Sequence, residues 1–275
     1  MAMTAIRRSP ATKISALISD VDGTLVTEDK ILTERTQAAV AGLRAAGIAF
    51  AIISSRPPRG LRMLLEPLGI TTPIAGFSGG VIAKPDLSVI KQHLLSPEVA
   101  RRAADFITAC GIQVWVFSGK DWLVRDPSGP YVGLEERTVQ LRPTVLEDFG
   151  GALDIANKIV GVTEDFDLLT RCAGEARAMF AGSASVVRSQ RYYLDFTHPR
   201  ANKGTAVVAL SKLMATAVAE IAVIGDGDND IPMFERSGLS IAMGNAGPEV
   251  QQAADFVTDS YRKEGLANAI ARFIL

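Results

Sequence analysis

The strongest constraint on this chain is a series of short apolar runs, each ending in a polar or glycine cluster. The clearest runs are Ile14–Ile18, Ala49–Ile53, Ile221–Ile224 and Ser240–Met243. They lack sustained alternation with polar residues, which indicates strands that are covered on both faces. A parallel sheet between two layers of helices satisfies this pattern.

The segments between these runs carry the start and stop signals of helices. Thr33 can cap a helix that has Glu34 in its first turn, and Gly47 ends the same helix. Further helices are expected at 204–214 and from about residue 228 to residue 238. This alternation of strands and helices predicts a doubly wound α/β domain.

The middle of the chain has a different pattern, in which hairpins are mixed with helices. The expected elements are strands at 112–117 and 122–125 joined by a tight turn, helices at 97–109 and 166–180, and strands at 158–162 and 185–188. We therefore predict an α+β cap domain over 86–190, inserted in an α/β core of residues 13–85 plus 191–275. Residues 1–12 are interpreted as a solvated tail.

Composition and charge exclude several classes of protein. Apolar residues make up 48% and charged residues 21% of the chain, with a net charge of −1. This balance is that of an ordinary globular protein and argues against a broad electrostatic grip on nucleic acid or on acidic membranes. Cys110 and Cys172 are too few for a disulfide framework, and reduced thiols are the simpler interpretation. We expect a cytoplasmic protein, either monomer or homodimer, with no nucleic-acid or membrane partner.

A first acidic segment, Asp20-Val21-Asp22-Gly23-Thr24-Leu25, follows the first predicted strand. Open α/β sheets bind their ligands at the carboxyl ends of the strands, so this is a favoured place for a site. Gly23 allows a sharp turn that exposes backbone amides to an anion. The alternative is that Asp20 or Asp22 merely caps a turn.

A second acidic segment, Gly225-Asp226-Gly227-Asp228-Asn229-Asp230, follows another predicted strand. Three carboxylates so close together repel one another unless a cation neutralises them, and hard oxygen ligands suit Mg²⁺. The alternative is an acidic surface turn in which Asp228 caps a helix. The spacing lacks the closing Glu of a Ca²⁺ loop.

Two single residues complete the set of candidates. Ser54 follows the second core strand and can offer its hydroxyl and its amide to a phosphate oxygen. Lys203 precedes a predicted helix and can neutralise phosphate charge. Each signal is weak alone, since an isolated serine usually caps a turn and an isolated lysine is usually solvated.

The combination resembles the haloacid dehalogenase (HAD) superfamily of phosphohydrolases. The segment from Asp20 to Leu25 is similar to its first motif, DxDGT(L), and the segment from Gly225 to Asp230 to its fourth, GDxxND. Ser54 matches the second-motif hydroxyl residue and Lys203 the third-motif lysine. The long interval between these two residues leaves room for a cap there, which resembles the Cof-type, IIB branch. That branch includes sugar-phosphate phosphatases and phosphomannomutases.

Two segments depart from the pattern of this branch. Ser55 stands where many relatives have a glycine between the hydroxyl residue and the arginine. Ser78-Gly79-Gly80 stands where relatives often have Asn-Gly-Ala, in a loop that faces the substrate region in the family. The second departure affects the inference about the substrate more than the inference about the chemistry.

The resemblance implies an aspartyl-phosphate mechanism. Asp20 would be the nucleophile, and Asp22 would protonate the leaving oxygen and then activate water. Mg²⁺ would be held by Asp20, Asp226 and the backbone carbonyl of Asp22. The remaining implied roles are phosphate binding by Ser54, Lys203 and the Asp22-Gly23 amides, and orientation of metal waters and of Lys203 by Asn229 and Asp230.

The predicted function is that of a Mg²⁺-dependent phosphohydrolase that acts on a small phosphorylated metabolite, with a sugar phosphate favoured. A phosphomutase of the same superfamily and a non-catalytic sensor of phosphorylated metabolites are the alternatives. The cap residues best suited to a sugar face or a second anion are Trp115, Trp122, Arg125 and Arg188, although a structural or surface role is favoured for each. The same holds for His93 and His198.

Overall fold

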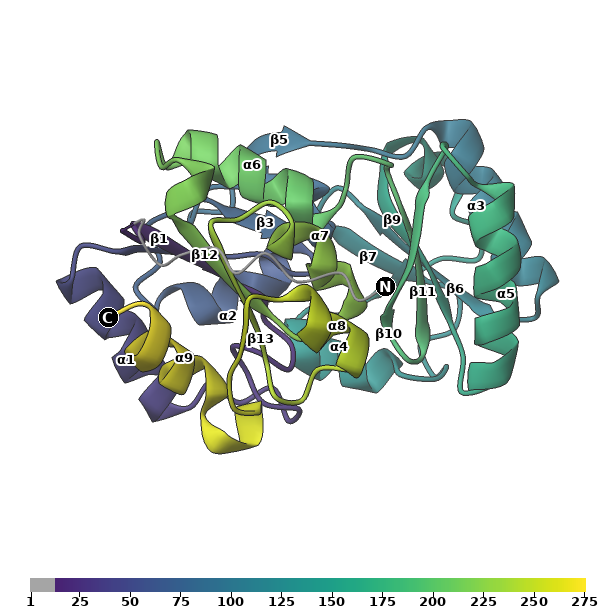
Figure 1. The fold of residues 1–275 in the computed structure, drawn as a ribbon. Helices are drawn as coiled ribbons and strands as arrows, with labels where there is room; N and C mark the ends of the chain where they lie inside the picture. Colours follow the sequence, from purple (N-terminus) through teal and green to yellow (C-terminus); the bar gives the residue numbers. More distant parts are fainter. Residues whose placement is uncertain (1–12) are drawn as a thin grey trace.

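The computed structural model describes residues 13–275, and the predicted tail at residues 1–12 lies outside them. The first sheet is parallel and has the strand order β14-β13-β12-β1-β2 (Figure 1). Its strands are β1 (Ala16–Ser19), β2 (Ala49–Ile52), β12 (Ile221–Gly225), β13 (Leu239–Ala242) and β14 (Phe256–Val257). The central strand β1 pairs with β2 on one side and β12 on the other, which brings distant parts of the sequence together.

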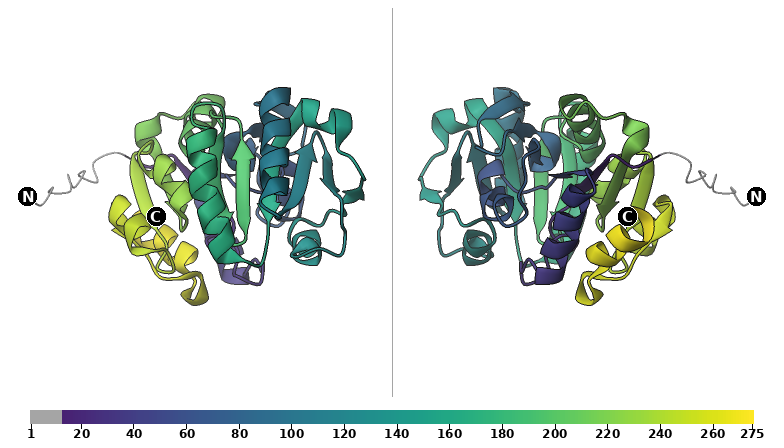
Figure 2. Two further views of the ribbon diagram at one scale, coloured as in Figure 1. Left: turned by 90° about the vertical axis from the view of Figure 1, so that its right-hand side faces the viewer. Right: turned by 90° about the vertical axis from the view of Figure 1, so that its left-hand side faces the viewer.

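Helices cover both faces of this parallel sheet, as the unbroken apolar strands predict. One face packs on α1 (Glu34–Ala45), α2 (Arg62–Leu65) and α9 (Gly265–Phe273), and the right-hand view of Figure 2 shows α1 and α9 side by side. The other face packs on α6 (Lys203–Leu213), α7 (Ile231–Phe234) and α8 (Pro248–Ala253). Successive strand residues point to opposite faces, so Leu17 enters the first cluster and Ile18 the second.

A second sheet is built from the middle of the chain and has the order β10-β11-β9-β6-β7-β8. Its strands are β6 (Gln113–Ser118), β7 (Asp121–Val124), β8 (Thr144–Val145), β9 (Ala156–Val162), β10 (Ser185–Gln190) and β11 (Tyr193–Thr197). The helices α3 (Pro97–Ala109) and α5 (Phe166–Met179) cover the face that points away from the parallel sheet (Figure 1). The shorter α4 (Val132–Val139) follows β7 in the sequence.

The opposite face of the second sheet carries buried aromatic side chains that pack against the first part of the chain. Trp115 and Trp122 are buried, with ring centroids 4.9 Å apart. Phe117 of the same face lies 5.5 Å, centroid to centroid, from Phe77. The two tryptophans therefore have the structural role favoured for them, in an aromatic cluster that joins the second sheet to Phe77 and Val81.

A small three-stranded sheet contacts both the end of the parallel sheet and the six-stranded sheet. It contains β3 (Ile74–Gly76), β4 (Val81–Ala83) and β5 (Val89–Gln92), and a parallel bridge from Ile53 to Ala75 connects it to the end of β2. The chain leaves this sheet near His93 and returns from β11 near His198. The two imidazole rings are stacked, with centroids 5.0 Å apart.

The predicted fold class is confirmed: a parallel α/β sheet is combined with an inserted α+β unit. One helix is shorter than expected, because the segment from Asp228 forms a 3₁₀ turn to Asp230 before the single turn of α7. The pairing of β5 with β4 and of β11 with β9 crosses both predicted domain edges. The division into two domains stays a prediction.

Two further features bear on the class of protein. Cys110 and Cys172 are free cysteines, as the interpretation of reduced thiols expects. Across residues 13–275 there is no helix with the length and apolar character needed to cross a bilayer.

Candidate active site

The residues singled out in the sequence converge at the carboxyl ends of neighbouring parallel strands. Asp20 directly follows β1, Ser54 follows β2, and Asp226 directly follows β12. The strands are in register, with Ser19 opposite both Ile52 and Ile224, so their ends lie at one edge of the sheet. Strand pairing therefore brings these side chains together, as expected for an open α/β sheet.

Lys203 is the buried cation at the centre of this edge. Its Nζ donates to Asp20 Oδ1 and to Asp230 Oδ1, at 2.5 Å in each case, and the residue is only 1% exposed. Burial alone would lower the pKa of Lys203, but the Asp20 and Asp230 carboxylates raise it above its ordinary value. Lys203 is therefore a permanent positive charge beside Asp20.

Asp230 fixes both this lysine and the loop after β12. While its Oδ1 accepts from Lys203, its Oδ2 accepts from the backbone amides of Asp226 and Gly227, at 2.9 Å each. Both carboxylate oxygens are thus engaged by the protein. The contact between Asp230 and Lys203 fits the predicted role of Asp230, which is to orient this lysine.

Asp20 and Asp226 are the carboxylates best placed to hold a cation. Oxygen atoms of Asp20, Asp226 and Asp230 lie within 4.8 Å of one another. Burial raises the pKa of Asp20 to about 6, and burial together with the carboxylates of Asp20 and Asp230 raises the pKa of Asp226 well above its ordinary value. Crowded oxygen donors with raised pKa values fit a hard divalent cation, which would offset their repulsion.

The Asp226 carboxylate is oriented by two side chains that the sequence analysis missed. Thr24 Oγ1 donates to Asp226 Oδ1 at 2.9 Å. Asn245 Nδ2 donates to Asp226 Oδ2 at 3.1 Å and to the carbonyl of Gly23 at 3.0 Å. The signal for Thr24 lay within the first acidic segment itself, whereas nothing near Asn245 in the sequence indicates the site.

Gly23 is required where the first acidic segment turns. Its φ is +83°, in the left-handed region, and a Cβ there would lie 2.4 Å from Asp226 Oδ2. Any side chain would therefore displace the carboxylate. Because residue 23 has no side chain, the turn can approach the Asp226 carboxylate closely.

Asp22 is held by two basic residues that the sequence analysis also missed. Arg56 donates Nε to Asp22 Oδ2 at 2.8 Å and Nη2 to Oδ1 at 2.7 Å, a bidentate pair, and Lys30 Nζ lies 2.8 Å from Oδ1. Burial alone would raise the pKa of Asp22, but Arg56 and Lys30 hold it well below its usual range. In this arrangement Asp22 is a paired carboxylate.

Arg56 also connects the site to the inserted unit. Its Nη1 donates to the carbonyl of Thr138, in α4, at 2.8 Å. Arg56 is buried, and its guanidinium bridges the Asp22 carboxylate and a helix of the inserted unit. The sequence signal was present, since Arg56 directly follows the Ser54-Ser55 pair.

Ser54 is buried, and only part of its predicted role fits the structure. Its amide donates to the carbonyl of Ala75 at 2.9 Å and is therefore not available to a phosphate, contrary to the expectation. Its hydroxyl oxygen accepts from the amide of Arg56 at 3.1 Å. The hydroxyl hydrogen is the group that is left to donate.

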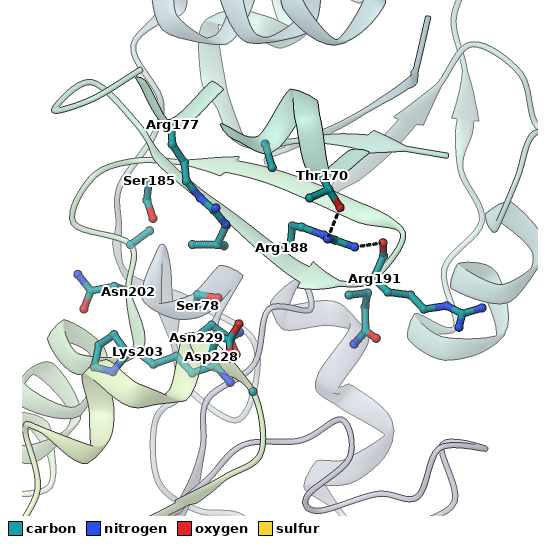
Figure 3. A pocket seen from close by; sticks show the side chains of 16 residues that line it. Ser78, Thr170, Arg177, Ser185, Arg188, Arg191, Asn202, Lys203, Asp228 and Asn229 are labelled. Carbon is teal, nitrogen blue, oxygen red and sulfur yellow. Dashed lines mark hydrogen bonds between the residues drawn. The ribbon is translucent and has the colours of Figure 1, made fainter. Parts of the chain in front are cut away.

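Two adjoining cavities open onto the acidic residues and Lys203. The smaller, of about 330 Å³, is lined by Asp20, Asp22 and Asp226, and the larger, of about 550 Å³, by Lys203 and by side chains of the inserted unit (Figure 3). The two cavities share three lining residues: Gln190, Gly227 and Asn229. Ser78, from the loop expected to face the substrate, lines the larger cavity.

Comparison with known proteins shows the family. A family model for haloacid dehalogenase-like hydrolases matches residues 17–270. The chain belongs to this family of hydrolases, as its motifs predict. The match spans both the parallel sheet and the inserted unit.

The similar proteins match over almost their whole length. A Haemophilus influenzae protein provisionally named a phosphatase is 28% identical over 253 residues, covering 92% of this chain and 95% of its own. A haloacid dehalogenase-like hydrolase of known structure from Bacteroides thetaiotaomicron is 26% identical, covers 94% of this chain and 99% of its own, and has a TM-score of 0.83. A solved sugar phosphatase of HAD subclass IIB, 23% identical, shares the fold with a TM-score of 0.81 over 95% of this chain and 100% of its own.

We expect Mg²⁺ to stabilise the folded protein through Asp226. At a concentration ~100 times the dissociation constant, a cation that binds only the folded state adds ~2.7 kcal/mol, or roughly 5 °C or more in melting temperature. Asp226→Asn should abolish this increase, while Asp228→Asn, outside the three-carboxylate cluster, should keep it. Differential scanning fluorimetry with MgCl₂ or chelator measures both.

The increase in melting temperature with Mg²⁺ should depend on pH, and the raised pKa values of the carboxylates give the direction. Protons compete with the cation for Asp20 and Asp226, whose pKa values are raised. The increase with Mg²⁺ should therefore be larger at about pH 8 than at about pH 5. An equal increase in Asp226→Asn and in the unmodified protein would contradict the assignment of the site.

Proposed function

We propose that this protein is a Mg²⁺-dependent phosphohydrolase that removes phosphate from a small phosphorylated metabolite, with a sugar phosphate as the favoured class. The observation that carries the proposal is the buried Lys203 between Asp20 and Asp230, with Asp226 alongside, at the carboxyl ends of parallel strands. Membership of the hydrolase family and the phosphatase names of its relatives support it. A cytoplasmic location and a monomeric or homodimeric state stay predictions.

Asp20 is the nucleophile of the proposed reaction. Its carboxylate attacks the phosphorus, the ester bond to the leaving oxygen breaks, and an aspartyl phosphate forms that water then hydrolyses. Lys203 holds Asp20 in place and supplies positive charge where the phosphoryl oxygens gather. The Ser54 hydroxyl and the amide of Asp22 are proposed as further donors to the phosphate. The Gly23 amide, for which the same role was expected, instead donates to the carbonyl of Val26 at 3.2 Å.

Asp20 and Asp226, with the backbone carbonyl of Asp22, are the groups proposed to hold Mg²⁺. A bound Mg²⁺ would screen the negative charge of nucleophile and phosphate from each other. Thr24 and Asn245 keep the Asp226 carboxylate oriented for this role. Asn229, which lines both cavities, is proposed to orient metal-bound water.

Asp22 is the proposed acid and base, and its contacts impose a condition on that role. A carboxylate with a pKa far below neutrality carries no proton to give to a leaving oxygen. Asp22 must therefore move away from Arg56 and Lys30 before it can be protonated. Because Arg56 also contacts Thr138, movement of the inserted unit relative to the parallel sheet provides a way to release it.

The inserted unit is proposed as the cap that selects the substrate. Its strand β10 contributes Ser189 and Gln190 to the cavity above Asp20 and Asp226. On the basis of strand pairing, we extend this cap through β11, to Thr197, beyond the predicted edge at residue 190. A solved subclass IIB sugar phosphatase shares the fold over 95% of this chain.

We expect Mg²⁺-dependent release of inorganic phosphate from p-nitrophenyl phosphate and from at least one sugar phosphate. Chelator should stop the release, and Asp20→Asn should lower kcat by at least about 10⁴-fold, in the range seen when a nucleophile is removed. Asp167→Asn, an exposed substitution on α5, is the control and should be unchanged. Transfer of phosphate between hexose positions with no phosphate release would instead identify a phosphomutase, and binding without either reaction would identify a sensor.

We expect the effect of Asp22→Asn to depend on the leaving group. General acid catalysis contributes roughly 10²–10⁴-fold, and a sugar alkoxide needs this proton far more than nitrophenolate does. The loss in kcat/KM should therefore be larger for glucose 6-phosphate than for p-nitrophenyl phosphate. Since the two substrates are compared on one protein, a folding defect affects both equally, and equal losses would refute the acid role.

A further inference from the structure

The larger cavity contains two guanidinium groups that the proposed phosphate chemistry does not use. Arg177 of α5 and Arg188 of β10 line it, across from Lys203 and Asn229 (Figure 3). Neither arginine takes part in an ion pair with any residue in the described part of the chain. Asp228 supplies the single carboxylate of the lining, and the residues that the inserted unit contributes include arginines and no acid. The surface of the inserted unit that faces the cavity is therefore positively charged.

Arg188 is held in a fixed orientation by its two terminal nitrogens, while its Nε is left without a partner. Its Nη1 donates to Thr170 Oγ1 at 2.9 Å and its Nη2 to the carbonyl of Arg191 at 2.5 Å. Its Nε is buried and has no hydrogen-bond partner, and the same holds for the neighbouring hydroxyl of Ser189. Buried polar atoms without partners are rare in folded proteins, and a bound ligand is one explanation for them.

The backbone is irregular at the same point. The pairing of β10 with β11 shifts register between Val187 and Gln190, the stretch that contains Arg188 and Ser189. Such irregularities often lie beside active sites, where they change the direction in which a side chain points. The register shift thus lies at the same two residues whose polar atoms, Arg188 Nε and Ser189 Oγ, lack partners.

Arg191, the third arginine in the lining, does not contribute in the same way. Its guanidinium carbon lies 4.4 Å from the centroid of the Phe166 ring, and Figure 3 shows the side chain directed away from Arg177 and Lys203. The guanidinium groups on the cavity side are thus those of Arg177 and Arg188. Arg177 uses its Nε in a long contact of 3.4 Å with the carbonyl of Val186.

We propose that Arg177 and Arg188 bind a second anionic group, a phosphate or a carboxylate, of a substrate whose reacting phosphate lies at Asp20. This inference rests on the proposed function and narrows its substrate to small metabolites with two anionic groups. The two cavities adjoin through Gln190, Gly227 and Asn229, so one molecule can reach both ends. A volume of about 550 Å³ is in the range of small-molecule sites, and guanidinium groups favour phosphate and carboxylate.

The test measures binding to the Asp20→Asn protein, which lacks the proposed nucleophile. Isothermal titration in the presence of Mg²⁺ compares fructose 1,6-bisphosphate with fructose 6-phosphate, and 6-phosphogluconate with glucose 6-phosphate. We expect the bisphosphate, the phosphocarboxylate or both to bind at least about 10-fold more tightly than the matched monophosphate. A preference in one pair alone identifies the second group as phosphate or as carboxylate.

The arginines are tested in the same background. Arg177→Gln, at an exposed position, and Arg188→Gln should each reduce this preference to about 3-fold or less, while Arg171→Gln, also exposed on α5 but outside the cavity lining, should leave it intact. Equal affinities within both pairs would overturn the proposal. A preference that survives both cavity substitutions would overturn it as well.

Failure of the proposed function would look different from failure of this inference. An arginine-dependent preference in the Asp20→Asn protein supports the anion site whether or not the protein with Asp20 intact releases phosphate. If the intact protein released none from a ligand that is bound in this way, the site would stand and the hydrolase would not. If phosphate were released equally well from both members of each pair, with equal affinities, the hydrolase would stand and the anion site would not.

Discussion

The buried ammonium group of Lys203 is the interaction on which the candidate site depends. It joins Asp20 at the end of β1 to Asp230 in the loop after β12, and the burial of all three residues makes the contacts strong. Removing one partner of a buried ion pair leaves an uncompensated charge and typically costs about 3–5 kcal/mol. The lysine thus has a structural role, because it neutralises a crowded acidic edge, and in the proposed reaction a chemical one, because it leaves a positive charge beside the proposed nucleophile, Asp20. Its place at the start of α6 connects both roles to the parallel sheet.

The second theme is the contact between the two structural units at the site. The aromatic face of the six-stranded sheet packs against Phe77, and the guanidinium of Arg56 connects Asp22 to α4. Nearby, Lys158 of β9 forms a buried ion pair with Asp195 and reaches the carbonyl of Ser55 at a longer distance of 3.4 Å. A change in the position of the cap would therefore be felt directly by Asp22. In the proposed reaction, this coupling would link protonation of the leaving group to closure over a substrate.

Much of the fold and the acidic centre could be predicted from sequence because each depends on local signals. Short apolar runs ending at Asp20, Ser54 and Asp226 mark strand ends, and parallel strands bring their ends together without further information. Arg56 could have been predicted from its place beside Ser54, whereas Lys30 and Asn245 could not, because their contacts depend on loops whose paths the sequence pattern does not determine.

The errors in the predicted elements also have physical causes. Strand β11 contains Asp195, an acidic residue that is unusual in a buried strand and is neutralised by Lys158 from β9. Its apolar pattern was therefore hidden, and this strand was missing from the predicted elements. The helix expected from about residue 228 to Gly238 is divided because Pro232 has no backbone N–H to donate to the preceding turn, so α7 begins at Ile231 with this proline in its first turn. In the first case a long-range polar contact hides the local pattern, and in the second a single proline divides the helix.

The measurement that tests the central claim most directly is chemical trapping of the covalent intermediate. The protein would be quenched in acid during turnover of a phosphate ester, reduced with borohydride and digested for mass spectrometry. An acyl phosphate on Asp20 is reduced to homoserine, so the account predicts this conversion at residue 20, dependent on both substrate and Mg²⁺. Phosphate release without modification at Asp20, or with modification at another carboxylate, would contradict it.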